Sequence, residues 1–257
     1  MKVTFLGSGT SQGVPVIACD CNVCKSQDPR DKRLRSSIIL TQYGKNYVVD
    51  CGPDFRQQML ENNVNSLSAI LFTHEHKDHV AGLDDVRAYN FIQKKDMEVF
   101  CSSRVEEAIR REYHYIFAEN KYPGTPSVNI NRINSDSPFT IDSDLEVIPI
   151  EVMHYNLPVL GFRFGDFTYI TDAKTVAEEE RKKIRGSKIL VINTLRRSEH
   201  ISHFNLEEAL EFIADISPEK AYLTHISHLF GTHKEIQQLL PANVAVAYDG
   251  LTLQIDI

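Results

Sequence analysis

Residues with the chemistry of metal ligands are concentrated in one short stretch, "FTHEHKDH", residues 72–79. It contains His74, His76, Asp78 and His79, and it follows the apolar run at 69–72 directly. Imidazole nitrogens and carboxylate oxygens are suitable ligands for zinc, manganese or iron. His74 and His76 are two residues apart, whereas two histidines that share a helix face are four apart. We therefore expect these ligands in a loop between a strand and a helix.

Three further candidate ligands each follow an apolar run. "VIPIEVM" ends at His154, "FTYIT" at Asp172 and "KAYLT" at His225. If these runs are strands that share sheets, their ends meet at one edge. The seven candidates are more than one tetrahedral zinc can use. The sequence thus predicts two divalent metal ions, zinc or manganese, at that edge.

A separate set of thiols lies near the N-terminus, in "ACDCNVCK". Cys19, Cys21 and Cys24 have the C-x-C-x-x-C spacing that is typical of a closed structural zinc site with one more ligand. His228, three residues beyond His225, is the candidate for that fourth ligand. We expect one structural zinc ion at this cluster.

The elements that must position these residues alternate along the chain. The run 36–52 predicts a hairpin that turns at 43–46, and a second turn is expected at Gly165-Asp166. Helical patterns fit 54–61, 80–92, 105–117, 176–184, 206–213 and 233–240, with Asn205 and Glu208 as a capping box. The segment 119–138, rich in Asn, Pro and Ser, is expected to be a surface loop. No repeat or linker divides the chain, so residues 1–257 are expected to form a single domain of two mixed sheets with helices outside.

Composition narrows the classes of partner. The formal net charge of −7 argues against broad attraction to nucleic acid, although the run "RDKRLR" at 30–35 is a local basic stretch. Such runs are most often solvated faces. No apolar run approaches the roughly 20 residues that span a bilayer, and no signal segment is evident. The expectation is a cytoplasmic protein without a membrane partner.

The ligand pattern resembles that of a known family. The stretch H-x-H-x-D-H at 74–79, followed in order by His154, Asp172 and His225, is similar to the ligand set of the metallo-β-lactamase superfamily, as is the turn 50–52. This resemblance implies an α/β fold, a four-layer αβ/βα sandwich of two mixed sheets with the site at one edge. It also implies a division of roles: one metal held by His74, His76 and His154, the other by Asp78, His79 and His225, and Asp172 between them. Asp50 would orient a ligand or its loop, and a role as a helix-turn cap stays open.

The cysteines narrow the resemblance. Together with His225, His228 and the stretches "VTFLGSGTSQGVP" and "HFNLEEAL", they resemble the PhnP-type phosphodiesterases, which hydrolyse cyclic or simple phosphodiesters. In that resemblance His203 corresponds to a histidine near the scissile phosphate, where it would protonate the leaving alkoxide. His200 is the alternative for this role. Arg196 and Arg197 could steady the phosphate.

The function implied is a dinuclear metal-dependent phosphodiesterase that acts on a small phosphodiester. Two metals roughly 3.5–4 Å apart can hold a shared hydroxide at neutral pH, with His203 and Asp78 as the catalytic side chains. The stretches 36–40 and 48–60 also resemble the start of ribonuclease Z, but the acidic charge, the lack of a long basic arm and the cysteines disfavour a nucleic-acid substrate. Thioester or lactam hydrolysis is less expected. A non-catalytic metal-binding module would be expected to have lost ligands, and a homodimer stays open.

Overall fold

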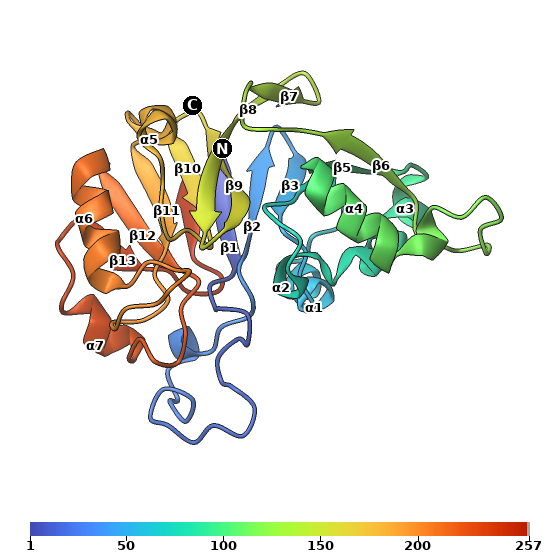
Figure 1. Ribbon diagram of the computed structural model, residues 1–257. Helices are drawn as coiled ribbons and strands as arrows, with labels where there is room; N and C mark the ends of the chain where they lie inside the picture. The colour runs from blue at the N-terminus through green and yellow to red at the C-terminus, as the bar shows by residue number, and fades with distance from the viewer. Residues whose placement is uncertain (256–257) are drawn as a thin grey trace.

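Two sheets of seven strands face each other in the computed structural model, which describes residues 1–255 (Figure 1). The first sheet has the order β14-β1-β2-β3-β4-β5-β6 and the second the order β13-β12-β11-β10-β9-β8-β7. The strands of the first sheet are β1 Lys2–Gly7, β2 Ser37–Gln42, β3 Lys45–Val49, β4 Ala69–Leu71, β5 Met97–Cys101, β6 Val128–Arg132 and β14 Thr252–Gln254. Those of the second are β7 Phe139–Ile141, β8 Leu145–His154, β9 Leu157–Phe164, β10 Phe167–Ile170, β11 Ile189–Asn193, β12 Lys220–Thr224 and β13 Val244–Val246.

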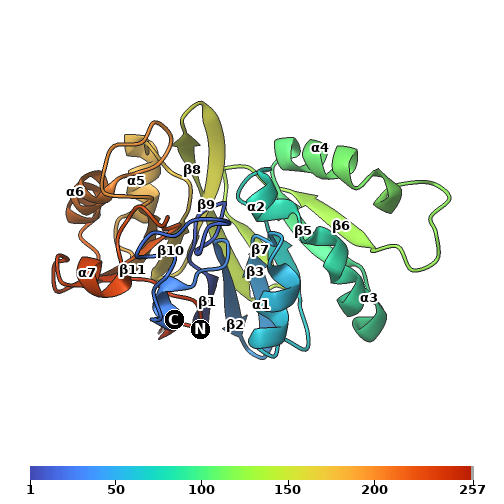
Figure 2. The same cartoon turned by 90° about the horizontal axis from the view of Figure 1, so that it is seen from below.

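Helices cover the outer face of each sheet (Figure 2). The first sheet is covered by α1 Phe55–Glu61, α2 Lys77–Val80, α3 Arg87–Gln93 and α4 Ser103–Glu112. The second is covered by α5 Glu178–Ile184, α6 Leu206–Ile216 and α7 His233–Gln237. Short 3-10 turns lie at Pro29–Asp31, Leu83–Val86 and His114–Ile116. The expected four-layer αβ/βα sandwich is therefore confirmed.

Three apolar layers hold the sandwich together. Side chains such as Phe5, Phe162 and Tyr169 fill the space between the sheets, and a further core lies under each helical layer. A fully buried aromatic or aliphatic side chain contributes roughly 1.5–3 kcal/mol by leaving water. These layers make the sheets a rigid support for the loops at their edges.

Both sheets change from antiparallel to parallel pairing halfway across. Strands β3 to β6 run parallel in the first sheet, and β10 to β13 run parallel in the second. The carboxyl ends of parallel strands lie at one edge, and the register pairs Val49 with Leu71 and Asn193 with Thr224. The loops that leave β3, β4, β10 and β12 therefore begin at the same edge of the sandwich, which is where the candidate ligands lie.

Several predicted elements are confirmed in detail. The first hairpin turns at Tyr43 and Gly44, both with positive φ, so the turn has two residues rather than the four expected. Asn205 caps α6, and Glu208 closes a complete capping box. No helix among residues 1–255 is both long enough and apolar enough to cross a membrane.

Two expectations about elements were wrong. The segment 119–138 is not loop throughout, because β6 pairs in parallel with β5 inside it. Its Asn129 and Asn131 donate hydrogen bonds to Glu98, while Val128 and Ile130 pack on the core, so the strand does show the alternation of polar and apolar residues and was overlooked within an Asn-, Pro- and Ser-rich segment. The helix expected over 80–92 is broken after α2, where Gly82 lies so close to the carbonyl of Gly52 that a Cβ would be 2.2 Å from its oxygen.

Candidate metal centre

The seven histidine and aspartate candidates converge at the shared edge of the two sheets, on loops from both. We call them the histidine–aspartate centre: His74, His76, Asp78, His79, His154, Asp172 and His225. The backbones of Asp172 and His225 have φ values of 58° and 57°, and that of neighbouring Asp50 has 65°. Non-glycine residues seldom adopt this left-handed conformation, and such strain clusters at functional sites.

The histidine pair of the first loop presents its free nitrogens to one point. His74 Nε2 and His76 Nδ1 lie 3.0 Å apart. Thr73 Oγ1 donates its proton to Asp50, so at 3.0 Å it accepts from His74 Nδ1–H. His74 Nε2 is thereby left with a lone pair, as a metal ligand requires.

Asp50 fixes the ring of His79 in the same way. Its Oδ2 accepts the Nδ1–H of His79 at 2.7 Å, and its Oδ1 accepts the backbone N–H of Thr73 at 2.9 Å. His79 Nε2 is buried without a hydrogen-bond partner and lies 3.1 Å from Asp78 Oδ2 and 3.3 Å from Asp172 Oδ2. An unpaired, buried ring nitrogen that faces two carboxylates is a ready cation ligand.

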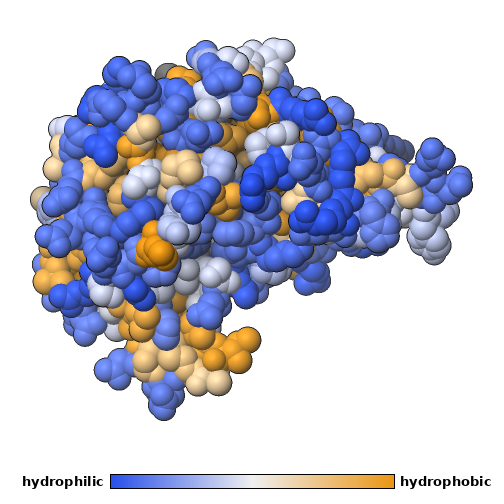
Figure 3. All heavy atoms as spheres, viewed as in Figure 1, coloured by the Kyte–Doolittle hydropathy of each residue, from blue (hydrophilic) through white to orange (hydrophobic). Residues whose placement is uncertain are grey.

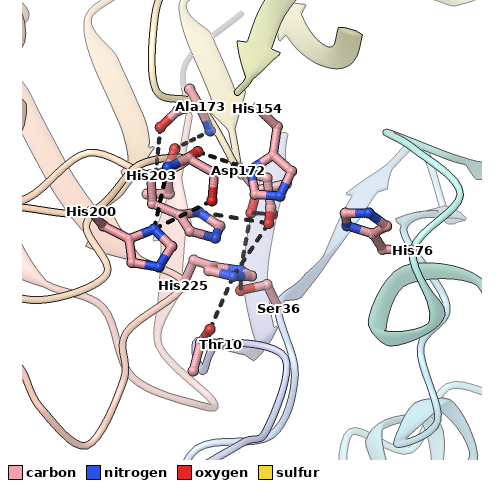
Figure 4. Close-up of polar contacts among 12 residues, drawn as sticks. Thr10, Ser36, His76, His154, Asp172, Ala173, His200, His203 and His225 are labelled. Carbon is pink, nitrogen blue, oxygen red and sulfur yellow. Dashed lines mark hydrogen bonds and ion pairs between the residues drawn. The ribbon is translucent and has the colours of Figure 1, made fainter. Parts of the chain in front are cut away.

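Asp172 also faces a histidine on its other side (Figure 4). Its Oδ1 lies 3.3 Å from His225 Nε2, and Thr171 Oγ1 donates to its Oδ2 at 2.5 Å. His225 Nδ1 lies 3.2 Å from Ser36 Oγ, and its Nε2 lies 3.1 Å from Thr10 Oγ1. The carboxylate of Asp172 therefore stands between the rings of His79 and His225.

His154 and His203 close the side of the centre that belongs to the second sheet. His154 Nδ1–H donates to the Ser202 carbonyl at 2.9 Å, which leaves its Nε2 free. The His203 ring is buried, stacks on His225 with centroids 4.9 Å apart, and keeps an unpartnered Nδ1 that lies 3.8 Å from Asp172 Oδ1. His200 lies farther out, with its ring 5.2 Å from that of His203 (Figure 4).

The buried charges of the histidine–aspartate centre favour the binding of cations. Burial alone would lower the pKa of His79, but Asp78, Asp50 and Asp172 reverse this effect and raise it well above its usual value. Burial alone would raise the pKa of Asp172, but His225 and His79 hold it well below its usual range. The buried carboxylates around His79 thus favour positive charge at the centre. Divalent cations would supply that charge, so the residues present fit metal ions.

The donor atoms fall into three overlapping groups, each within 4.8 Å. The first group has His74, His79 and Asp172; the second has Asp78, His79 and His225; the third has His154, Asp172 and His203. The second equals one of the two expected ligand sets. The other expected set, His74, His76 and His154, is not one of these three groups, and His76 is exposed.

The cysteine site, defined as Cys19, Cys21, Cys24 and His228, is a second candidate. Its four donor atoms also lie within 4.8 Å of one another, with His228 Nδ1 at 3.2 Å from Cys19 Sγ and 3.5 Å from Cys21 Sγ. The backbone N–H of Cys24 lowers the pKa of Cys21 to about 6, whereas burial raises that of Cys24 to about 11. A thiolate beside a histidine in this arrangement fits zinc.

A hollow of about 460 Å³ opens beside the centre. We call it the substrate hollow; it is lined by His76, Arg104, His154, Tyr155, Asn156, Leu157, Ile201 and Ser202. Arg104 is the cation among these residues, and it forms an ion pair with Glu75. This ion pair links Glu75, in the loop after β4, to α4. Arg196 donates to the carbonyls of Ser198 and Glu199 in its own loop, so the expected phosphate role of the Arg196–Arg197 pair has no support in its contacts.

Arg104 was missed, although the sequence carries a signal for it. It follows β5 and the helix cap Ser102, whose side chain accepts from Val105 N–H. Because β5 is parallel to β4, residues just after β5 reach the same edge as His74. The rule that strand ends converge, applied to this strand as well, would have placed Arg104 at the site.

Known proteins resemble the whole chain. A family model described as "Beta-lactamase superfamily domain" matches residues 45–226. An octanoyltransferase of Porphyromonas gingivalis (strain ATCC BAA-308 / W83) is 43% identical over 258 residues, which is 100% of this chain and 52% of that protein. The chain spans about half, or less, of the length of the first curated relatives that it matches.

Solved structures give a fuller match. A diphosphatase from the PhnP family has a TM-score of 0.92 at 34% identity, covering 100% of this chain and 98% of that one. The short form of human tRNase Z has a TM-score of 0.73 at 18% identity, with full coverage of both chains, and shows the shared fold alone. Because the family model covers most of the chain and the diphosphatase matches over nearly its whole length, this chain belongs to the metallo-β-lactamase superfamily, in its PhnP-like subgroup.

Proposed function

We propose that the protein is a metal-dependent phosphodiesterase acting on small phosphodiesters, cyclic ones included. The observation that carries this proposal is the position of Asp172, whose two oxygens lie 3.3 Å from His79 Nε2 and from His225 Nε2. One carboxylate that faces two donor sets is suited to stand between two cations. When bound, two divalent ions supply a nucleophilic water at neutral pH and neutralise charge on the phosphate oxygens.

His203 is placed to handle the proton of the leaving group. Its buried, unpartnered Nδ1 points toward the centre and lies 3.8 Å from Asp172 Oδ1. Burial lowers the pKa of His203 to about 3, so the imidazole is neutral in the substrate-free protein at pH 7. A phosphodiester anion beside the ring favours the protonated form. The substrate thereby helps to charge the acid that protonates its own leaving oxygen.

The substrate hollow is the seat for an ester group of the substrate. It borders His76 and His154 on one side and Arg104 on the other, with exposed Tyr155 and Ile201 as apolar walls. The opposite side of the centre is closed by buried Thr10 and Ser36. A volume of about 460 Å³ suits a small molecule rather than a folded nucleic acid.

A ribonuclease Z-like activity is the alternative, and the charges of the surface weigh against it. In the basic stretch 30–35, Arg30 pairs with Asp28, Arg35 pairs with Asp54, and Arg33 is buried. These arginines are therefore not free to neutralise phosphates of an RNA backbone. The octanoyltransferase relative favours no second activity for this chain, because its name belongs to a protein of which the alignment covers 52%.

A substrate panel tests the proposal. The protein, loaded with Mn²⁺ or Zn²⁺, would be offered bis-p-nitrophenyl phosphate, 2′,3′-cyclic nucleotides and a precursor tRNA. We expect turnover of the small diesters and no processing of the tRNA. Cleavage of the tRNA with inert small diesters would support the nuclease instead, and inertness toward all three would reject both.

A further inference from the structure

The cysteine loop, residues 11–35, begins and ends beside the same imidazole. Thr10, just before the loop, has its Oγ1 3.1 Å from His225 Nε2, and Ser36, just after it, has its Oγ 3.2 Å from His225 Nδ1. Figure 4 shows both residues on the N-terminal segment, next to the His225 ring. The two ends of the loop therefore contact both nitrogens of one proposed metal ligand.

Ser36 decides which nitrogen of His225 carries the proton. Its hydroxyl donates to the Gly9 carbonyl at 2.9 Å, so its single hydrogen is used and it accepts from His225 Nδ1–H. Thr171 Oγ1, 3.4 Å from the same nitrogen, has likewise given its hydrogen to Asp172. His225 Nε2 therefore keeps its lone pair, which faces the Thr10 hydroxyl at 3.1 Å and which a bound ion would use in place of that hydroxyl. An outer partner of this kind raises the affinity of a histidine for its ion.

The tip of the loop holds the segment just after His225. Cys19 and Cys21 lie 3.2 and 3.5 Å from His228 Nδ1. Between the two histidines, Ile226 accepts the Thr10 N–H at 3.1 Å and donates its own N–H to the Ser8 carbonyl at 2.9 Å. The segment 225–228 is thus held at successive residues by the loop and by the strand end before it.

The base of the loop is firmly built, but its tip has few contacts of its own. At the base, Val14 and Arg33 exchange backbone hydrogen bonds of 2.9 and 2.7 Å. At the tip the buried core consists of Val14, Val23 and Cys24, and Ile17 is 94% exposed. The loop projects from the lower edge of the molecule as a lobe with apolar side chains on its surface (Figure 3). An ion in the cysteine site would therefore be the main tie between this tip and His228.

We propose that the cysteine loop is a positioning element for His225. An ion in the cysteine site strengthens the binding of the ion held by Asp78, His79 and His225, because it fixes His228 and, through Ser36 at the end of the loop, the orientation of the His225 ring. By linkage, an ion at the histidine–aspartate centre strengthens binding at the cysteine site by the same factor. The inference rests on the proposed function only in that the histidine–aspartate centre binds ions.

The proposed coupling can be tested by measuring the metal affinity of the full chain, without an activity assay. The wild type, Cys21→Ser and the matched control Cys101→Ser, which alters a buried thiol of β5, would be dialysed against graded chelator and their ions counted. We expect Cys21→Ser to lose the ion of the cysteine site and to bind one ion of the other centre about tenfold more weakly, with Cys101→Ser unchanged. Wild-type affinity at the histidine–aspartate centre of Cys21→Ser would overturn the proposal.

A second set of variants leaves the cysteines intact. Ser36→Ala removes the hydroxyl that accepts from His225 Nδ1–H, whereas Thr10→Val removes the hydroxyl at Nε2, which a bound ion would displace. Ser36→Ala should weaken one ion of the histidine–aspartate centre about tenfold, whereas Thr10→Val should bind at least as tightly as the wild type. Unchanged affinity in Ser36→Ala, with folding verified by circular dichroism, would contradict the positioning role. Coupled binding in a protein that hydrolyses no phosphodiester would refute the proposed function and leave this inference standing.

Discussion

The Oδ2 atom of Asp50 accepts the Nδ1–H of His79 at 2.7 Å, and both side chains are completely buried. Asp50 follows β3 and His79 lies in α2, so this bond joins two loops at the edge of the first sheet. The sequence left two roles open for Asp50. Its contacts are those of a residue that orients a ligand, because α1 receives no side-chain cap from this part of the chain.

Replacing Asp50 by Asn should weaken metal binding at the histidine–aspartate centre by about 10–100-fold. Asn tolerates the left-handed backbone of position 50, so the loop should keep its path. Its amide, however, has a single oxygen, which cannot accept both from His79 Nδ1–H and from the Thr73 backbone N–H, so one of the two bonds is lost and the His79 ring is held less firmly. Competition with a chelator measures the affinity, and Asp96→Asn, at an exposed position, is the control. Equal affinity in both variants would count against the orienting role.

His203→Ala should slow hydrolysis of a diester with a poor alkoxide leaving group by roughly 10²–10⁴-fold, and that of an aryl diester far less. The reason is that p-nitrophenolate departs without a proton, whereas an alkoxide needs one. Steady-state kinetics on the two substrates give the comparison, with His200→Ala as the matched variant. Equal losses on both substrates would refute the general-acid role of His203. If His200→Ala, rather than His203→Ala, slowed only the diester with the poor leaving group, the general-acid role would belong to His200.

Arg104→Ala should raise KM for small phosphodiesters about 10-fold or more, with a smaller change in kcat. A hydrogen bond from a charged group contributes roughly 1.5–3 kcal/mol, and the guanidinium lies in the substrate hollow rather than at the reacting atoms. Arg111→Ala removes an exposed arginine from the same helix and should leave both constants unchanged. An unaltered KM in Arg104→Ala would exclude this side of the hollow as the seat of the ester group.

The stability of the fold should fall as the pH drops from about 6.5 toward 4, in part because of His233. Burial, helped by Arg30 and Arg33, lowers the pKa of His233 to about 4 in the folded protein. In the unfolded chain His233 has a pKa of about 6.5, and above that pH the ring is neutral in both the folded and the unfolded state. Below that pH the unfolded state binds a proton before the folded state does. The free energy of unfolding therefore falls until the pH reaches the pKa of the folded state. We expect His233 to account for roughly 1–2 kcal/mol of this loss.

Comparison with His233→Gln isolates that contribution. Because the chain has no tryptophan, unfolding by urea is best followed by circular dichroism at several pH values. The variant should lose less stability than the wild type between pH 6.5 and 4. Parallel curves for the two proteins would show that His233 does not couple to folding.

The architecture, and the set of side chains that meet at one edge of the sheets, could be predicted from the sequence. His74, Asp172 and His225 follow apolar runs, and parallel strands bring such positions together whatever the details of the loops. The cap of α6 could also be predicted, because Asn205 and Glu208 interact within one turn of the chain. These are local patterns or consequences of sheet topology.

Contacts between distant loops could not be read in this way. Ser36 and His225 are 189 positions apart, and nothing in either neighbourhood indicates that the two side chains touch. The pair of Glu75 with Arg104 depends on the position of α4 relative to the loop after β4. In both cases the deciding interaction is tertiary rather than local.

The central claim is tested most directly by titrating metal-stripped protein with Mn²⁺ or Zn²⁺ while following hydrolysis of bis-p-nitrophenyl phosphate. Activity should rise with the ions bound at the histidine–aspartate centre. Asp172→Asn, which keeps the left-handed backbone but removes the charge between His79 and His225, should bind fewer ions and remain inactive. Hydrolysis by the metal-stripped wild type, or full activity of Asp172→Asn, would contradict the account.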